Sequence, residues 1–138
     1  MEYIHLISGA SLPVIQTSFP FKMLVLIEDE VSPQWQWNVS CWLVKAGCRF
    51  MMAWGRECSA WDDSVDYASL DAQDYQLGRD EDFVLTTWHT DDSISEVFDF
   101  CMNSTFHPSL KLSNTVILHI AKCPNMELVA IVENAGKS

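Results

Sequence analysis

This sequence has no basic segment before its first apolar residues, no long apolar run and no C-x-x-C pair. The opening residues Met1–Ile7 carry no basic residue ahead of their apolar side chains, and Ser8-Gly9 interrupts them, so we expect no cleaved signal peptide. No apolar run approaches the roughly 18 residues that a membrane span needs. The five cysteines contain no C-x-x-C pair, and an odd set favours reduced thiols over a disulfide framework. We therefore expect a cytoplasmic protein that does not engage a membrane.

Basic residues are scarce. The chain has 8 Lys and Arg against 19 Asp and Glu, a formal net charge of −11. Between Glu57 and Asp99 the only base is Arg79, among thirteen acids: Glu57, Asp62, Asp63, Asp66, Asp71, Asp74, Asp80, Glu81, Asp82, Asp91, Asp92, Glu96 and Asp99. Such a field repels nucleic acid and anionic lipid, and it attracts cations or basic protein surfaces. The alternative is that the acids only keep a chain with six tryptophans soluble.

Glycine-rich turns and metal-binding motifs are also missing. The first apolar strand runs into Glu28-Asp29-Glu30, where a dinucleotide site would need glycines whose amides meet a phosphate. A nicotinamide or flavin dinucleotide is therefore not expected. The histidines show no ligand spacing to one another or to the cysteines, which argues against structural zinc.

The sequence alternates apolar strands with amphipathic helices over the length of a single domain. At 138 residues and 49% hydrophobic content, residues 1–138 can bury a core as a single domain. Apolar runs predict strands over Phe21–Glu28, Cys48–Trp54, Phe83–Trp88, Thr115–Ile120 and Leu128–Val132. Cap residues and apolar periodicity predict helices from Pro33 to Ala46, from about Cys58 to Ala72, and from Ser93 to a point before Pro108.

This alternation predicts an α/β fold, a three-layer α/β/α sandwich around a mostly parallel sheet. The last two strands are joined by a short loop through Pro124-Asn125, which favours an antiparallel hairpin at the sheet edge. Residues 1–20 are expected to supply a possible edge strand and loop, and residues 134–138 a flexible tail.

One candidate site is catalytic. In parallel sheets, ligands bind outside the carboxyl ends of the strands. There Cys58, His89 and Asp91 offer a nucleophile, a base and an orienting acid, as a small hydrolase or transferase requires. Arg56 and the helix start would favour the Cys58 thiolate. The alternative is that Cys58 belongs to the core and His89 is a surface hydrogen-bonding residue.

A second candidate is a divalent cation held by the carboxylates Glu28, Asp29, Asp91 and Asp92, because hard cations favour clustered oxygens. Residues Met23 to Glu30 also resemble the first strand and acidic pair of a response-regulator receiver domain. That resemblance implies a Mg²⁺ site with a phosphoacceptor aspartate and a lysine, and Lys122 follows a later strand as such a lysine would. Gly55-Arg56 departs from the receiver pattern. The alternative is that these acids are solvated helix caps.

The leading hypothesis is binding without catalysis. The acidic face of the second and third predicted helices would engage a basic protein, as an immunity protein or other toxin neutraliser does. Its contact residues would be Trp37, Arg56, Trp61, Asp62, Asp63, Asp66 and Trp88. An exposed tryptophan beside acids is typical of a binding hot spot.

Several segments together resemble a group of small uncharacterised bacterial proteins, a domain of unknown function. They are Met52–Gly55, Cys58, Trp61–Asp66, Phe83–Asp92 and Thr115–His119, within about residues 50 to 120. The resemblance implies a bacterial single-domain protein and transfers no activity.

Overall fold

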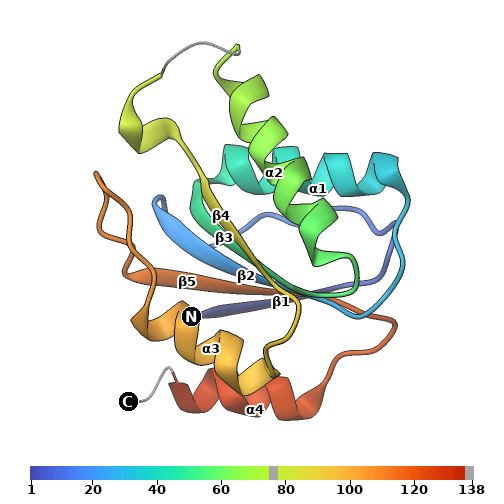
Figure 1. The fold of residues 1–138 in the computed structure, drawn as a ribbon. Coiled ribbons are helices and arrows are strands. Elements are labelled where there is room, and N and C mark those ends of the chain that lie inside the picture. Colours follow the sequence, from blue (N-terminus) through green and yellow to red (C-terminus); the bar gives the residue numbers. More distant parts are fainter. Residues whose placement is uncertain (75–77, 136–138) are drawn as a thin grey trace.

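The computed structural model describes residues 1–74 and 78–135, which form a five-stranded parallel sheet with helices packed against it (Figure 1). The strand order is β1-β5-β2-β3-β4, and every neighbouring pair is parallel. The strands are β1 (Glu2–Leu6), β2 (Phe21–Ile27), β3 (Cys48–Gly55), β4 (Leu85–His89) and β5 (Asn114–Ile120). The central strand β2 is buried along its whole length, which explains why every residue in it except Lys22 is apolar.

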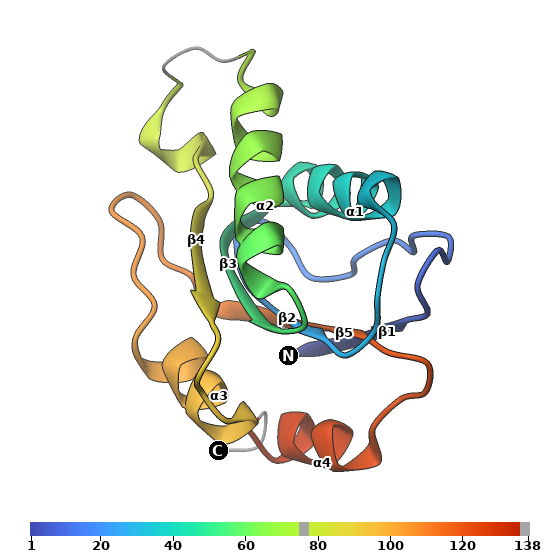
Figure 2. The ribbon, with the colours of Figure 1, turned by 45° about the vertical axis from the view of Figure 1, so that its right-hand side comes forward.

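Four α-helices lie within the described residues: α1 (Pro33–Ala46), α2 (Cys58–Ala72), α3 (Ile94–Asn103) and α4 (Met126–Ala135). Figures 1 and 2 show α1 and α2 on one side of the sheet and α3 and α4 on the other. Two apolar cores match this division. One contains Val39 and Val65 from the first pair of helices, and the other contains Val97 and Leu128 from the second pair. No helix in the described part of the chain is long and apolar enough to cross a membrane.

The helix starts predicted from cap residues are confirmed. Ser32 accepts a hydrogen bond from the Trp35 amide, and Pro33 occupies the first turn of α1. Ser93 and Glu96 form a capping box at the start of α3. The helix α1 ends at Gly47, whose φ of 119° is the left-handed conformation that glycine adopts without strain.

The predicted antiparallel hairpin is wrong. Residues 128–132 belong to helix α4, and the sheet is entirely parallel. A five-residue apolar run cannot by itself distinguish a strand from a buried helix segment. The deciding local signal is Asn125, whose side chain accepts hydrogen bonds from the Glu127 and Leu128 amides and so caps α4.

Three smaller predictions have different outcomes. The third predicted strand begins at Leu85 rather than Phe83, because a short 3₁₀ helix (Asp80–Asp82) precedes it. The expected N-terminal edge strand is present as β1, paired in parallel with β5. Of the expected flexible tail, residues 136–138 lie outside the described residues, and residues 134–135 close α4.

The connectivity creates a switch point between β2 and β5. The chain runs outward from β2 to β3 and β4 through α1 and α2, and it then returns through α3, across the other face, to place β5 beside β2. Receiver domains have the order 2-1-3-4-5, with the second and third strands on opposite sides of the first. Here both lie on the same side of β2, so the receiver resemblance does not extend to topology. The Glu28 amide donates to the Ile120 carbonyl at 2.9 Å and joins the two carboxyl ends.

Gly55 ends β3 at the same edge. Its φ is 103°, and a Cβ there would clash with the Ile27 carbonyl oxygen. That oxygen accepts a hydrogen bond of 2.8 Å from the Arg56 amide. Glycine is therefore required where β3 turns toward α2 against the end of β2.

Candidate functional site

Three carboxylates gather on α2. Asp62, Asp63 and Asp66 each offer an oxygen, and these oxygens all lie within 4.8 Å of one another. Residues four apart on a helix face the same side, which brings Asp62 and Asp66 together, and Asp63 flanks them. The Thr86 hydroxyl on β4 donates a 2.7 Å hydrogen bond to Asp66 and ties the cluster to the edge of the sheet.

Asp62 is buried, although the sequence predicts it to be a contact residue on the acidic face of this helix. Its residue surface is 4% exposed, and its Oδ2 atom has no hydrogen-bond partner. Burial, reinforced by the negative charge of Asp66, raises the pKa of Asp62 to about 6, while the Thr86 hydroxyl opposes the shift. The periodicity of α2 could not reveal this burial, because it depends on how β4 packs beside the helix.

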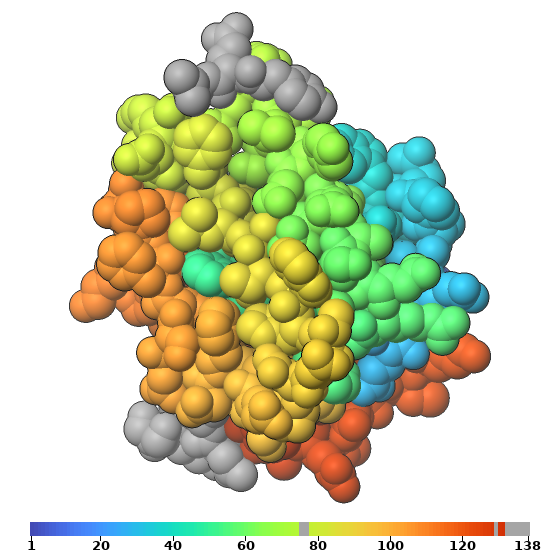
Figure 3. All heavy atoms as spheres, in the orientation of Figure 1, coloured from blue at the N-terminus to red at the C-terminus, as the bar shows by residue number. Residues whose placement is uncertain are grey.

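The edge strand β4 lies between α2 and α3 on the face shown in Figure 3, where it is coloured yellow. Side chains two residues apart on a strand share a face, so Trp88 lies on the same side as Thr86, toward α2. Trp88 is 53% exposed. The strand pairs only with β3 within the described chain, and its outer edge is open.

The other predicted contact residues are arranged differently. Trp61 is 1% exposed and belongs to the core between the sheet and the first two helices. Trp37 is partly buried against that same core. Arg56 is exposed and lies 3.7 Å from the Glu30 carboxylate. Of the seven predicted contact residues, Asp63, Asp66 and Trp88 are therefore the ones exposed together around β4.

The predicted catalytic set is not brought together. Cys58 is 2% exposed and packs into the core on the α1 and α2 side. The His89 ring packs against the ring of Phe100 on α3, with centroids 4.7 Å apart and planes tilted by 60°, on the opposite side of the sheet. The orienting carboxylate is Asp92 rather than Asp91, and it accepts a 2.7 Å hydrogen bond from His89 Nδ1. The Thr87 hydroxyl bonds the other ring nitrogen.

The four carboxylates predicted to hold a cation are also separate. Glu28 bonds to His119, Asp29 accepts from the Glu30 amide, and Asp92 bonds to His89, while Asp91 is exposed. Among the described residues, the metal-capable cluster of three or more ligands is the one on α2 and contains none of these four.

Sequence reasoning missed a chain of three polar side chains at the switch point. His119 on β5 is fully buried, and its Nε2 bonds to the Glu28 carboxylate at 3.1 Å. A carboxylate can only accept, so Nε2–H donates, and the Tyr3 hydroxyl donates to Nδ1 at 2.7 Å. Burial raises the pKa of Tyr3, which keeps this hydroxyl protonated. The available signal was a histidine inside the apolar run of β5.

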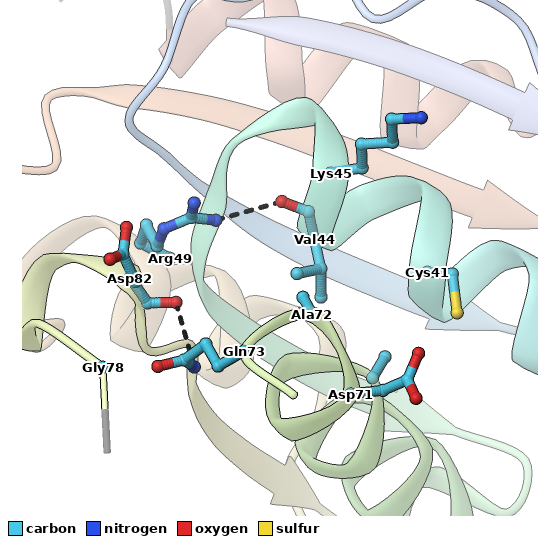
Figure 4. A pocket seen from close by; sticks show the side chains of 10 residues that line it. Cys41, Val44, Lys45, Arg49, Asp71, Ala72, Gln73, Gly78 and Asp82 are labelled. Atoms are coloured by element: carbon cyan, nitrogen blue, oxygen red, sulfur yellow. Dashed lines mark hydrogen bonds between the residues drawn. The ribbon is translucent and has the colours of Figure 1, made fainter. Parts of the chain in front are cut away.

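A cavity of about 620 Å³ opens at the opposite, amino-terminal edge of the sheet, between the ends of α1 and α2 (Figure 4). Arg49 forms part of its wall, and the guanidinium donates to the carbonyls of Val44, Cys48 and Glu81. Those hydrogen bonds give Arg49 a structural role. Gln73 is likewise bonded to the Ser69 carbonyl at 3.1 Å.

Fold and site together define a parallel α/β protein whose acidic cluster and exposed tryptophan lie at an edge strand. A family model matches residues 1–134 of the chain. The chain belongs to that family, described as Domain of unknown function (DUF7684). No curated protein and no solved structure matches it.

Proposed function

We propose that this protein is an acidic protein-binding module that captures a basic protein through β4 and α2, as an immunity protein or toxin neutraliser would. The observation that carries the proposal is Trp88, which is 53% exposed on an open edge strand beside the carboxylates of α2. Exposed tryptophans in such positions are typical binding hot spots.

Charge supports the proposal on both sides of the strand. Asp63 and Asp66 lie on the α2 side, and Glu96 and Asp99 are exposed on α3. Complementary charge raises association rates with a basic partner and disfavours acidic competitors. The proposed interface is therefore centred on β4 rather than on one helix face. Trp61 and Asp62 are buried beneath this interface and would not contact the partner.

The open edge of β4 supplies a second kind of contact. An unpaired strand offers backbone N–H and C=O groups, which a partner strand can join. In this arrangement Trp88 would pack against the partner's side chains while the backbone groups pair. Strand addition of this kind extends a sheet without rearranging it.

The test is affinity capture from a bacterial lysate, with quantification by mass spectrometry, followed by titration of the purified partner. Trp88→Ala and the double variant Asp63→Lys, Asp66→Lys should each weaken binding at least about tenfold. The controls are Phe106→Ala, which removes another exposed aromatic, and Glu127→Lys, which reverses a charge on α4. A partner that binds all four variants equally would refute the interface.

The setting that fits this function is the bacterial cytoplasm, with neither nucleic acid nor membrane as a partner. The strongly negative charge supports the exclusion of both anionic surfaces. The two helix pairs on the two faces of the sheet support a three-layer α/β/α sandwich, in which β4 is left uncovered as a recognition edge.

A second candidate is a small hydrolase or transferase acting at the switch point. The chain from Tyr3 through His119 to Glu28 favours it, because it links a buried imidazole to a carboxylate that is 37% exposed at the sheet's carboxyl edge. The sequence predicts a divalent cation held by Glu28, Asp29, Asp91 and Asp92, and of these four Glu28 belongs to the chain with His119. Ligand-observed NMR with small amines, carboxylates, phosphate esters and MgCl₂ tests both. A ligand lost in Glu28→Gln supports the site, and ligands indifferent to that change refute it.

A further inference from the structure

The three aspartates on α2 are spaced like the ligands of a metal ion. We infer that Asp62, Asp63 and Asp66 bind Ca²⁺ at the junction of α2 and β4. This inference does not rest on the proposed protein partner, although it shares Asp63 and Asp66 with the proposed interface. It also differs from a cation at Glu28, which lies at the end of another strand.

The ligand oxygens are close enough together to contact one ion. The candidate oxygens all lie within 4.8 Å of one another. Oxygens on opposite sides of a Ca²⁺ ion are about 4.6 to 5.2 Å apart, so all three carboxylates can reach a single Ca²⁺. Calcium also tolerates irregular coordination completed by water, as a site with two exposed ligands requires.

The charge of the cluster is not balanced by the protein. Among the described residues, the lysine and arginine ion pairs involve Arg56 and Arg79, and none reaches the three aspartates. Three adjacent carboxylates repel one another at neutral pH. A divalent ion would remove that repulsion at a single point.

A second, independent observation is the state of Asp62. Its side chain is more than nine-tenths buried, and its Oδ2 has no hydrogen-bond partner. Buried charges in proteins are normally paired or coordinate a metal. An ion on this carboxylate would supply the missing partner and account for an acid placed under the edge strand.

The position of Asp66 is set by the neighbouring strand. Thr86 donates to its Oδ1 at 2.7 Å, which leaves the second carboxylate oxygen for an ion. Hydrogen bonds of this kind orient metal ligands, and their loss weakens affinity. Calcium would therefore join α2 to β4 through Asp66 and Thr86.

The experiment measures binding to the purified, EDTA-treated chain. Terbium(III) is the first probe, because excitation of the protein's tryptophans makes it luminesce when bound to oxygen ligands. Calcium chloride should displace it, and calorimetric titration with calcium chloride should give one site per chain. Far-UV circular dichroism confirms that each variant is folded before it is titrated.

Asp62→Asn, Asp63→Asn and Asp66→Asn should each weaken calcium binding at least about tenfold, because each removes a charged ligand. Thr86→Val should weaken it less, in the range of about tenfold or below, because it only frees Asp66. Asp71→Asn, an exposed acid on the same helix, is the matched control and should bind as wild type does.

Binding that is equally weak in Asp71→Asn, or within twofold of wild type in Asp66→Asn, would overturn the site. Binding of magnesium chloride but not calcium chloride would overturn the assignment to calcium. Partner capture is measured separately, in EDTA. A loss of calcium binding can therefore be distinguished from a loss of partner binding.

Discussion

Asp62 and Asp66 lie one helical turn apart on α2 and bring their carboxylates into one cluster, with the first buried and the second held by Thr86. Like charges at this spacing oppose each other, and burial adds to the cost. The protein thus carries a local electrostatic strain at its edge strand, which a proton or a cation can relieve.

The first prediction concerns the pH dependence of stability. The pKa of Asp62 is raised from 3.8 to about 6, so between those pH values the folded state binds more protons than the unfolded state. Its contribution to stability therefore falls as the pH rises through that range and stays low above it. Asp62→Asn should stabilise the protein by about 1 kcal/mol at pH 7.5 and by less at pH 4.5.

Urea denaturation at the two pH values, in EDTA, measures this difference. Asp71→Asn should show no comparable pH-dependent gain in the free energy of unfolding. A stability difference between Asp62→Asn and wild type that is the same at both pH values would contradict the burial of this acid.

The second prediction compares two glycines of positive φ. Gly55→Ala should cost more than about 2 kcal/mol, because the new Cβ combines left-handed strain with a clash against the Ile27 carbonyl oxygen. Gly9 has a φ of 85° and nothing within 4 Å of an added Cβ, so Gly9→Ala should cost about 1 kcal/mol. Thermal denaturation measures both losses of stability. Equal losses in Gly55→Ala and Gly9→Ala would show that β3 moves away from β2 to make room for the new Cβ.

The third prediction concerns the buried chain of three side chains. His119→Phe should destabilise the protein by about 2 kcal/mol or more, since it leaves the Tyr3 hydroxyl and Glu28 without their shared partner. Glu28→Gln retains an acceptor for Nε2–H and should therefore lose less stability than His119→Phe. Nitrogen-15 NMR of the imidazole should show Nε2 protonated and Nδ1 accepting. The opposite tautomer would contradict the hydrogen-bond directions derived above.

The fourth prediction concerns thiol reactivity. Burial raises the pKa of Cys48 to about 12 and that of Cys101 to about 11, and Cys58 is also buried. In the native protein a thiol reagent should label Cys123 first, because it is exposed, and should label these three only on unfolding. Peptide mapping after timed labelling measures the order. Rapid labelling of Cys58 in the native protein would support the nucleophilic role predicted for it from the sequence.

Much of the fold follows from local sequence signals. The strands β2, β3 and β5 are rich in apolar residues, and the helices α1 and α3 begin at strong caps, so their positions could be predicted. Helix α4 could not, because residues 128–132 are too short and too apolar to show a period. Its cap, Asn125, follows Pro124, and a Pro-Asn pair equally predicts a turn.

The candidate site was harder to predict, because it depends on which face each strand residue takes. His89 and Trp88 are adjacent in sequence, yet they point to opposite sides of the sheet. A register one residue different would have placed His89 on the side of Cys58. The burial of Asp62 and the pairing of His119 with Glu28 likewise depend on strand neighbours that no local spacing reveals.

The insertion of β5 between β1 and β2 has a consequence for biosynthesis. Strand β1 leaves the ribosome before the other four strands of the sheet, yet among the described residues it pairs only with β5, more than a hundred residues later in the chain. Strands β2, β3 and β4 can associate as each is completed, whereas the nascent β1 must wait unpaired until β5 emerges. The sheet therefore closes only after all five strands have been synthesised, and β1 stays without a strand partner for longer than any other strand.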